Sequence, residues 1–169
     1  DDESAAKVRR LRAHGSKMKY HHVDIGLNSR LDAIQATVLR VKLPRVEDWN
    51  RRRAALADHY RAAGRRLNLP PGIVFPAACP PGNHVYHQFV IRAPERDRLR
   101  DFLKERAIGT EIYYPVPLHL QECYRDMGLS AGAYPESERA CRDALALPMF
   151  PELTEQEVDR VVESIRDFM

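Results

Sequence analysis

Two neighbouring stretches of this chain have apolar residues at every third or fourth position, and one proline separates them. In residues 29–43 the repeating apolar residues are Leu31, Ile34, Val38 and Val41. In residues 44–67 they are Val46, Trp49, Leu56, Tyr60, Ala63 and Leu67. This spacing predicts two amphipathic helices. Proline lacks the N–H that a helix interior needs but is tolerated in a first turn, so we expect a break at Pro44.

The sequence SRLD at 29–32 predicts the start of the first helix. In a capping box, the Ser29 hydroxyl accepts a bond from a first-turn N–H and the Asp32 carboxylate reaches back. Gly26 and Asn28 stand just before this start and Arg30 just inside it. Free N–H groups and the helix dipole favour an anion at such a helix end, whereas the simpler alternative is an ordinary turn and cap.

The rest of the pattern predicts a small α/β layer. The alternating sequence HVYHQFVIR favours a strand at 85–92, with His87 on the same buried face as Phe89 and Ile91. Thr154 and Glu157 predict a capping box before the last helix. The other expected elements are an N-terminal helix that ends at His14-Gly15, a polar irregular segment at 16–28, a proline-rich loop at 67–84, helices at 95–107, 119–127 and 136–146, and a strand at 109–115.

Composition places this chain of 169 residues among globular proteins, with 44% hydrophobic and 30% charged residues. We expect no membrane association and a cytoplasmic location, because no apolar run approaches the ~20 residues of a membrane span and no signal peptide opens the chain.

Of the 27 basic residues only five are lysines and the rest are arginines, so nucleic acid has to be considered as a partner. Acidic residues are interleaved with the arginines, which is typical of helix faces exposed to solvent. We therefore expect that the chain does not bind nucleic acid. An arginine-rich helical binding module stays open as an alternative. The absence of an initial methionine and the early helix suggest a piece of a longer protein.

Cysteine and histidine spacing predicts no metal site. The three cysteines, Cys79, Cys123 and Cys141, form no CxxC pattern, so we expect buried or half-buried free thiols. His14, His21 and His22 are close in sequence but have no acidic or cysteine partner at ligand spacing. No nucleophile elbow, phosphate-binding glycine loop or fixed pair of carboxylates is present.

One further histidine, His119, follows the proline-broken sequence YYPVPL and opens a short helix. A loop that follows the end of a strand in this way often faces a cleft, so His119 is a candidate site residue. The alternative is that His119 has a purely structural role.

Five segments together resemble the C-terminal part of the DegT/DnrJ/EryC1/StrS family of pyridoxal-phosphate sugar aminotransferases. They are LRAHG, GLNSRLDAIQATVLRVKLPRVEDWNRRRAALADHY, VYHQFVIR, IGTEIYYPVPLHLQ and LALPMFPELTEQEVDRVVESI. The resemblance implies an α/β, fold-type-I enzyme. It divides this chain into the end of the large cofactor-binding domain (1–28), long connecting helices (29–68) and a small C-terminal α/β domain (69–169).

The resemblance also implies the activity and its site. Such enzymes are homodimers with shared active sites that move an amino group, usually from glutamate, to a nucleotide-linked keto sugar used in cell-surface polysaccharides or secondary metabolites. Asn28 is expected to reach the phosphate of the partner subunit's pyridoxal phosphate, and Arg30 to lie near that phosphate or the substrate. His119 is expected to line the sugar-nucleotide pocket, with Lys19 and Tyr20 near the substrate diphosphate.

The sequence departs from the family in lacking the lysine that binds the cofactor covalently. That lysine follows a serine-led strand before a glycine-rich segment, and none of the five lysines here has this setting. We therefore expect no catalytic residue in this chain and no activity from it alone. A pyridoxal-phosphate sugar dehydratase of the same family stays open, since some relatives replace the lysine with histidine.

Overall fold

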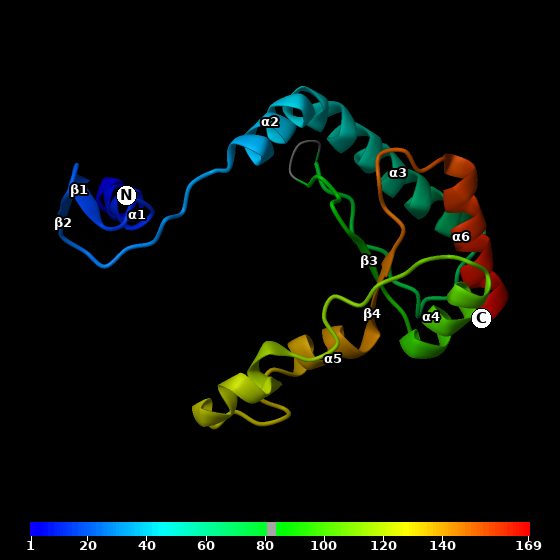
Figure 1. Cartoon of the computed structure of the whole chain (residues 1–169). Coiled ribbons are helices and arrows are strands. Elements are labelled where there is room, and N and C mark those ends of the chain that lie inside the picture. Colours follow the sequence, from blue (N-terminus) through cyan, green and yellow to red (C-terminus); the bar gives the residue numbers. More distant parts are fainter. Residues whose placement is uncertain (81–83) are drawn as a thin grey trace. The chain divides into compact units, whose positions relative to one another are not determined.

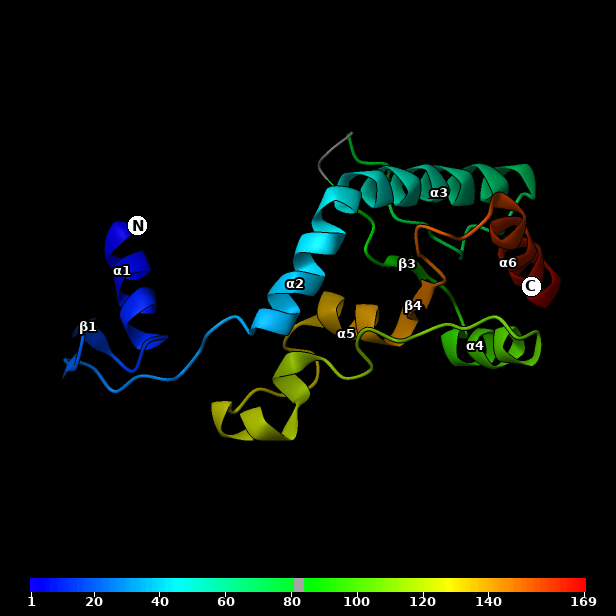
Figure 2. The same ribbon diagram turned by 45° about the horizontal axis from the view of Figure 1, so that its top comes forward.

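The computed structural model describes residues 1–80 and 84–169 (Figures 1 and 2). The chain forms two compact units, Asp1–Val46 and Glu47–Met169. Across the described residues, no helix combines the length and the apolar character needed to cross a membrane.

The first unit is built from two helices and a small hairpin. Helix α1 spans Asp2–Leu11, and β1 (Ser16–Met18) pairs antiparallel with β2 (His21–His22). Helix α2 covers Ala33–Lys42 and is followed by the 3₁₀ turn η1, Leu43–Arg45. The break predicted at Pro44 is therefore confirmed as a 3₁₀ turn between two helices.

The second unit packs helices around a two-stranded antiparallel sheet. Strand β3 (Phe89–Arg92) pairs with β4 (Ala144–Leu147), with Phe89 opposite Leu147 and Arg92 opposite Ala144. The helices are α3 (Val46–Arg66, which begins at the unit boundary), α4 (Arg96–Glu105), α5 (Pro135–Asp143) and α6 (Glu155–Phe168), with 3₁₀ turns η2 (Leu118–Leu120) and η3 (Glu122–Met127). Figure 1 shows α6 beside α3 and α4.

An aromatic contact joins α3 to the sheet at the centre of the core. The rings of Tyr60 and Phe89 are stacked with centroids 4.7 Å apart, and both side chains are fully buried. The Tyr60 hydroxyl donates to the carbonyl oxygen of Pro148 at 2.9 Å. Burial, reinforced by the negative charge of Glu157, raises the pKa of Tyr60. Helix α3 thus belongs to the same packed unit as the sheet.

The last helix begins as the sequence predicts. Thr154 accepts a bond from the Glu157 N–H, and the Glu157 carboxylate accepts one from the Thr154 N–H, which completes the capping box. Side-chain bonds then tie α6 to α3: Asp159 Oδ1 accepts from His59 Nε2 at 2.9 Å and from Arg66 Nη2 at 2.9 Å.

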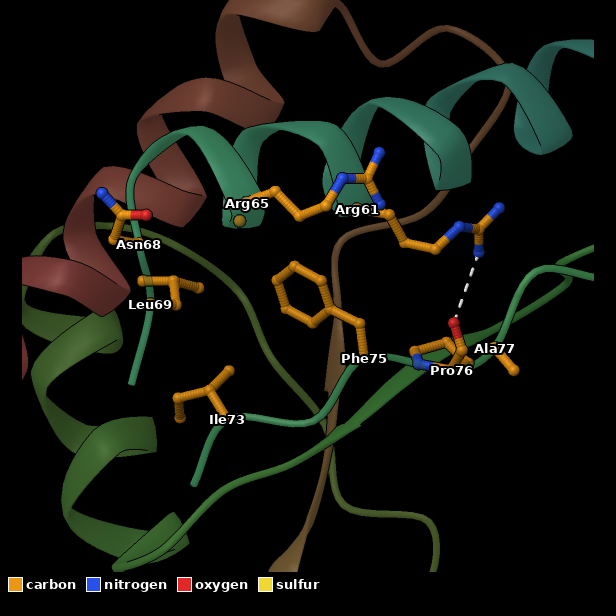
Figure 3. A pocket seen from close by; sticks show the side chains of 9 residues that line it. Arg61, Arg65, Asn68, Leu69, Ile73, Phe75, Pro76 and Ala77 are labelled. Carbon is orange, nitrogen blue, oxygen red and sulfur yellow. Dashed lines mark hydrogen bonds between the residues drawn. The ribbon is translucent and has the colours of Figure 1, made fainter. Parts of the chain in front are cut away.

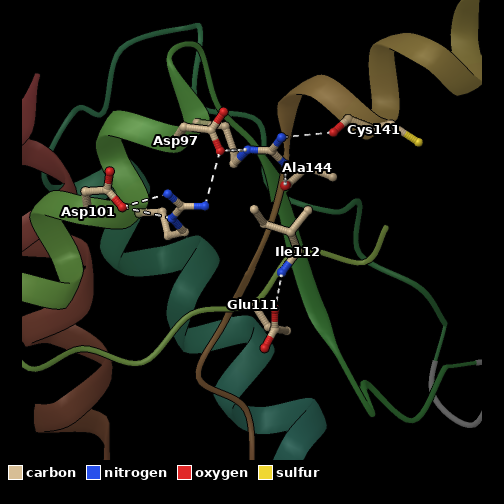
Figure 4. Close-up of polar contacts among 8 residues, drawn as sticks. Asp97, Asp101, Glu111, Ile112, Cys141 and Ala144 are labelled. Atoms are coloured by element: carbon tan, nitrogen blue, oxygen red, sulfur yellow. Dashed lines mark hydrogen bonds and ion pairs between the residues drawn. The ribbon is translucent and has the colours of Figure 1, made fainter. Parts of the chain in front are cut away.

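A buried arginine joins the ends of three elements (Figure 4). Arg96, in the first turn of α4, donates to the carbonyl oxygens of Ala144 at 2.8 Å and Cys141 at 3.1 Å, and its Nε bonds Asp97. The guanidinium group thereby satisfies carbonyls at the end of α5 and the start of β4. This contact fixes the direction in which α5 leaves the sheet.

Helix α2 starts later than the sequence predicts. Its N-cap is Asp32, whose carboxylate accepts bonds from the N–H groups of Ile34 at 2.8 Å and Gln35 at 3.2 Å. Ser29 does not cap the helix, since its own N–H bonds the carbonyl oxygen of Arg12 at 2.9 Å. The predicted capping box at 29–32 is therefore wrong.

The predicted strands also need correction. The predicted strand at 85–92 forms only over Phe89–Arg92. Residues 109–115 form no strand: Glu111 makes an isolated bridge to Ala146, and Pro115 has no N–H with which to extend a ladder. The partner strand is β4, which covers the end of the predicted helix 136–146.

Several smaller expectations differ from the structure as well. His87 lies outside β3 and is exposed rather than buried in the core. Cys79 and Cys123 are exposed, and only Cys141 is half-buried. All three thiols are free, as predicted.

Candidate functional site

The segment that carries four of the predicted site residues folds back on the end of α1. His14 and Gly15 take positive φ angles of 59° and 70°, which turn the chain into the hairpin. The N–H of Leu27 then bonds the carbonyl oxygen of Leu11 at 2.7 Å. A Cβ atom at Gly26 would lie 2.3 Å from Gly15 N, so glycine permits this close approach. Gly26 does not have a positive φ angle, so the close approach, and not an unusual backbone conformation, is what requires glycine here.

Asn28 has a fixed backbone and an exposed side chain. Its backbone forms a bridge with Ala13, and the neighbouring Ser29 N–H is bonded to Arg12. Within the described part of the chain, no hydrogen bond involves the Asn28 side-chain amide, which is free to bind an external acceptor.

The start of α2 has a cap from within the chain, as the simpler of the two sequence alternatives expects. The carboxylate of Asp32 accepts bonds from the N–H groups of Ile34 and Gln35, and residues 29–32 separate Asn28 from the helix. Arg30 lies in this non-helical stretch and is exposed. An acceptor bound here would therefore meet an amide and a guanidinium, without help from the helix dipole.

Lys19 and Tyr20 lie together at the turn of the hairpin. The ammonium of Lys19 is 5.1 Å from the centre of the Tyr20 ring, and Tyr20 is 81% exposed. His22 Nδ1 braces the hairpin through contacts of 2.9 Å with the His14 carbonyl oxygen and 3.0 Å with Ser16 Oγ. No group of three potential metal ligands is found in the described residues.

His119 belongs to a separate cluster in the second unit. It lies in η2, its side chain is 7% exposed, and its Nε2 is 3.0 Å from Glu138 Oε1 on α5. The ring of Tyr134 packs edge-on against the imidazole, with centroids 4.9 Å apart. Histidine and its partner are far apart in sequence, so spacing alone could not reveal Glu138 or Tyr134.

A groove lies next to this cluster. One wall is the segment from Tyr113 to Leu118, and the other is α5 with Ser137, Ala140 and Cys141. Tyr113 and Tyr114 are 40% and 69% exposed, so the groove presents aromatic faces and phenol hydroxyls.

A second hollow lies between the last turns of α3 and the loop that follows (Figure 3). The ring of Phe75 lies beneath the helix, beside Arg65, while Arg61 reaches the Pro76 carbonyl oxygen at 3.5 Å. Among the residues that line it, the charged ones are Arg61 and Arg65.

Comparison with known proteins shows the family to which the chain belongs. The DegT/DnrJ/EryC1/StrS aminotransferase family matches residues 1–166. This chain belongs to that family. The pleiotropic regulatory protein of Geobacillus stearothermophilus is 48% identical over an alignment of 170 positions that covers 99% of this chain and 45% of the relative. The dTDP-3-amino-3,4,6-trideoxy-alpha-D-glucose transaminase of Streptomyces venezuelae is 40% identical, over 99% of this chain and 44% of the relative.

A solved structure confirms the predicted fold of this chain. S. venezuelae DesV, crystallised in complex with a ketimine intermediate, matches with a TM-score of 0.89 and 41% identity over 99% of this chain and 44% of that chain. The predicted α/β fold, that of the C-terminal small domain of a pyridoxal-phosphate aminotransferase, is thereby confirmed. The chain spans less than half the length of these relatives.

The five lysines of this chain, Lys7, Lys17, Lys19, Lys42 and Lys104, are all exposed. That none of them binds a cofactor covalently stays a prediction from the sequence.

Proposed function

We propose that this chain is the C-terminal part of a pyridoxal-phosphate-dependent aminotransferase that transfers an amino group, from glutamate, to a nucleotide-linked keto sugar. Its product would serve cell-surface polysaccharides or secondary metabolites, and we expect the enzyme to be cytoplasmic. The match to DesV carries the proposal, because that structure contains a ketimine and amino transfer requires such carbon–nitrogen adducts. The name of the Geobacillus relative describes regulation, so it does not specify a reaction.

The residues present fit a role in binding the cofactor phosphate. Bound pyridoxal phosphate supplies an electron sink for the carbon that carries the amino group. Asn28 offers an unpaired amide donor on a backbone held by hydrogen bonds, which suits a phosphate oxygen. We propose that it binds the phosphate of the partner subunit's cofactor.

The substrate would meet exposed cations and aromatic groups. Among the described residues Arg30 and Lys19 form no ion pair, so both charges are available to the diphosphate of a sugar nucleotide. Tyr20 lies beside Lys19 and offers a ring and a hydroxyl. We propose that His119 and the adjoining groove receive the sugar.

The exposed face of α2 supports a homodimer. Large apolar side chains on and around this helix are half or more exposed, including Leu31, Ile34, Leu39, Val41 and Leu43. Such a concentration of apolar surface is typical of a protein interface. A dimer in which Asn28 reaches across would cover part of it.

The two alternatives from the sequence, an arginine-rich helical module that binds nucleic acid and a sugar dehydratase, have less support. Four arginines of α3 pair with carboxylates, which leaves less free charge for nucleic acid: Arg51 and Arg52 with Asp48, Arg61 with Asp58, and Arg66 with Asp159. No observation favours a dehydratase over an aminotransferase.

The test uses the complete enzyme that contains this chain. With pyridoxal phosphate bound, one turnover with glutamate should release one equivalent of 2-oxoglutarate per site. The aminated enzyme should then transfer the group to a keto-sugar nucleotide, and in reverse accept it from dTDP-3-amino-3,4,6-trideoxy-α-D-glucose. An enzyme that binds pyridoxal phosphate but releases no 2-oxoglutarate and takes no amino group from the amino sugar would overturn the proposal.

A further inference from the structure

One carboxylate oxygen joins three segments beside the groove. Glu138 Oε1 accepts hydrogen bonds from His119 Nε2 at 3.0 Å, from the Gly132 N–H at 2.8 Å and from the Tyr134 N–H at 3.4 Å. The side chains of His119 and Glu138 are 7% and 12% exposed. Hydrogen bonds of this kind are strong because the acceptor is charged and little water competes.

The charge state of Glu138 determines which imidazole nitrogen carries the proton. The Gly132 N–H and then His119 lower the pKa of Glu138, against the opposing effect of burial, so the side chain is ionised at neutral pH. An ionised carboxylate only accepts hydrogen bonds. Nε2 of His119 must therefore be the donor, and in the neutral imidazole Nδ1 is left without a proton.

This pair also connects the two walls of the groove. Leu118, next to His119, lines one wall, and Ser137, next to Glu138, lines the other. The Tyr134 ring packs edge-on against His119 and restricts rotation of the imidazole. A break in the His119–Glu138 bond would remove this connection between the two walls.

We propose that Glu138 is a positioning residue: it holds His119 in the Nε2–H tautomer and, through it, keeps the segment from Tyr113 to Leu118 in place to receive the sugar nucleotide. The kinetic part of this inference rests on the proposed function, whereas the tautomer does not. Glu138 itself would not contact the substrate or the cofactor.

The tautomer can be measured on the chain by two-bond ¹H–¹⁵N correlation of the histidine rings above pH 8. His119 should give the Nε2–H pattern in the wild type and in Glu138→Gln, whose amide oxygen still accepts. Glu138→Ala should give a mixture of tautomers. The exposed His87 should not change in any variant. A wild-type His119 that carries its proton on Nδ1 would overturn the proposal, whatever reaction the enzyme performs.

The kinetic measurement uses the complete enzyme with dTDP-3-amino-3,4,6-trideoxy-α-D-glucose as the probe. Glu138→Ala should raise KM for this probe by about tenfold, the effect expected for one hydrogen bond to a charged group, with unchanged turnover of glutamate. Glu138→Gln should stay within about threefold of the wild type, since it keeps the acceptor. An unchanged KM in Glu138→Ala, or an equal loss of glutamate turnover, would contradict a positioning role. An inactive wild type that still shows the Nε2–H tautomer would refute the proposed function alone.

Discussion

The backbone of Gly64 lies against the ring of Phe75: a Cβ atom at Gly64 would come within 2.4 Å of Phe75 Cε2. Phe75 in turn packs edge-on against Phe89, with centroids 5.8 Å apart, so the ring cannot move away freely. Glycine inside a helix usually costs about 0.5–1 kcal/mol relative to alanine. The close contact with Phe75 accounts for a glycine in the last turn of α3.

Gly64→Ala should therefore destabilise the chain despite the better helix propensity of alanine. Overpacking costs about 1–3 kcal/mol, which exceeds the gain from propensity. Urea unfolding followed by circular dichroism measures the change. Gly109→Ala is the matched control, because a Cβ there meets no atom within 4 Å, and it should be neutral or slightly stabilising. A stabilised Gly64→Ala protein would show that Phe75 moves aside at little cost.

The contact between α3 and α6 should contribute stability that depends on pH. Partial burial opposes ionisation of Asp159, but hydrogen bonds from His59 and Arg66 outweigh it and lower the pKa of Asp159 below its ordinary value of 3.8. A group with a lowered folded-state pKa contributes stability above its unfolded pKa and loses it as the pH falls through the folded pKa. The contribution should be complete at neutral pH and disappear below about pH 3.8.

Asp159→Asn should accordingly lower the free energy of unfolding at pH 7 by up to about 1 kcal/mol, since the pair is partly exposed. The difference from wild type should shrink in acid. Glu155→Gln is the control: Glu155 is 3.9 Å from His59 Nδ1 and 76% exposed, so little should change. A difference for Asp159→Asn that stays constant from pH 7 to pH 3 would argue against the charged contact.

Local sequence signals predicted the helix ends that depend on neighbouring residues. The capping box of Thr154 and Glu157 and the break at Pro44 both formed, because their partners lie within one turn. The SRLD sequence does not form the predicted capping box. The Ser29 N–H bonds the Arg12 carbonyl oxygen, which is distant in sequence, and Asp32 is the N-cap of α2. A local motif decides the structure only where no tertiary contact competes with it.

Pairings between distant residues were not predictable from spacing. The sequence ALAL at 144–147 suits the end of a helix, yet it becomes β4 because it pairs with β3. The same holds for His119, whose partner Glu138 is on another helix. The role of Asn28 rests on the family resemblance and stays a prediction, and the helix dipole first invoked beside it acts from a helix that begins only at Ala33.

The 169-residue chain on its own should show no amino transfer with pyridoxal phosphate, glutamate and a keto-sugar nucleotide. None of its five lysines has the sequence setting of the family's cofactor-binding lysine, which follows a serine-led strand before a glycine-rich segment. Absorbance spectra with and without borohydride, followed by peptide mapping, test this expectation. Turnover together with specific reduction onto one lysine of this chain would contradict it.

Asn28→Ala in the complete enzyme should weaken cofactor binding without loss of fold. It removes one hydrogen bond to a charged phosphate, about 1.5–3 kcal/mol, which corresponds to about one to two orders of magnitude in Kd. Folding should be little affected, because the bonds that hold this segment are made by backbone atoms of Leu27 and Ser29. Cofactor titration by fluorescence and thermal unfolding without cofactor separate the two effects.

Mixed dimers then show which subunit's cofactor Asn28 serves. In one dimer, the first subunit carries Asn28→Ala and the second lacks the cofactor-binding lysine. If Asn28 acts across the interface, the remaining lysine lies in a site served by the intact asparagine, and that site should bind cofactor as in the wild type. In the other dimer, one subunit carries both changes and its partner is unchanged. The only cofactor-binding lysine then lies in a site that has lost its asparagine, and that site should bind cofactor weakly.

Two affinity tags isolate each dimer, and cofactor titration compares their affinities. If the first dimer is weak and the second is normal, Asn28 acts within its own subunit, and if both are normal, it does not bind the phosphate.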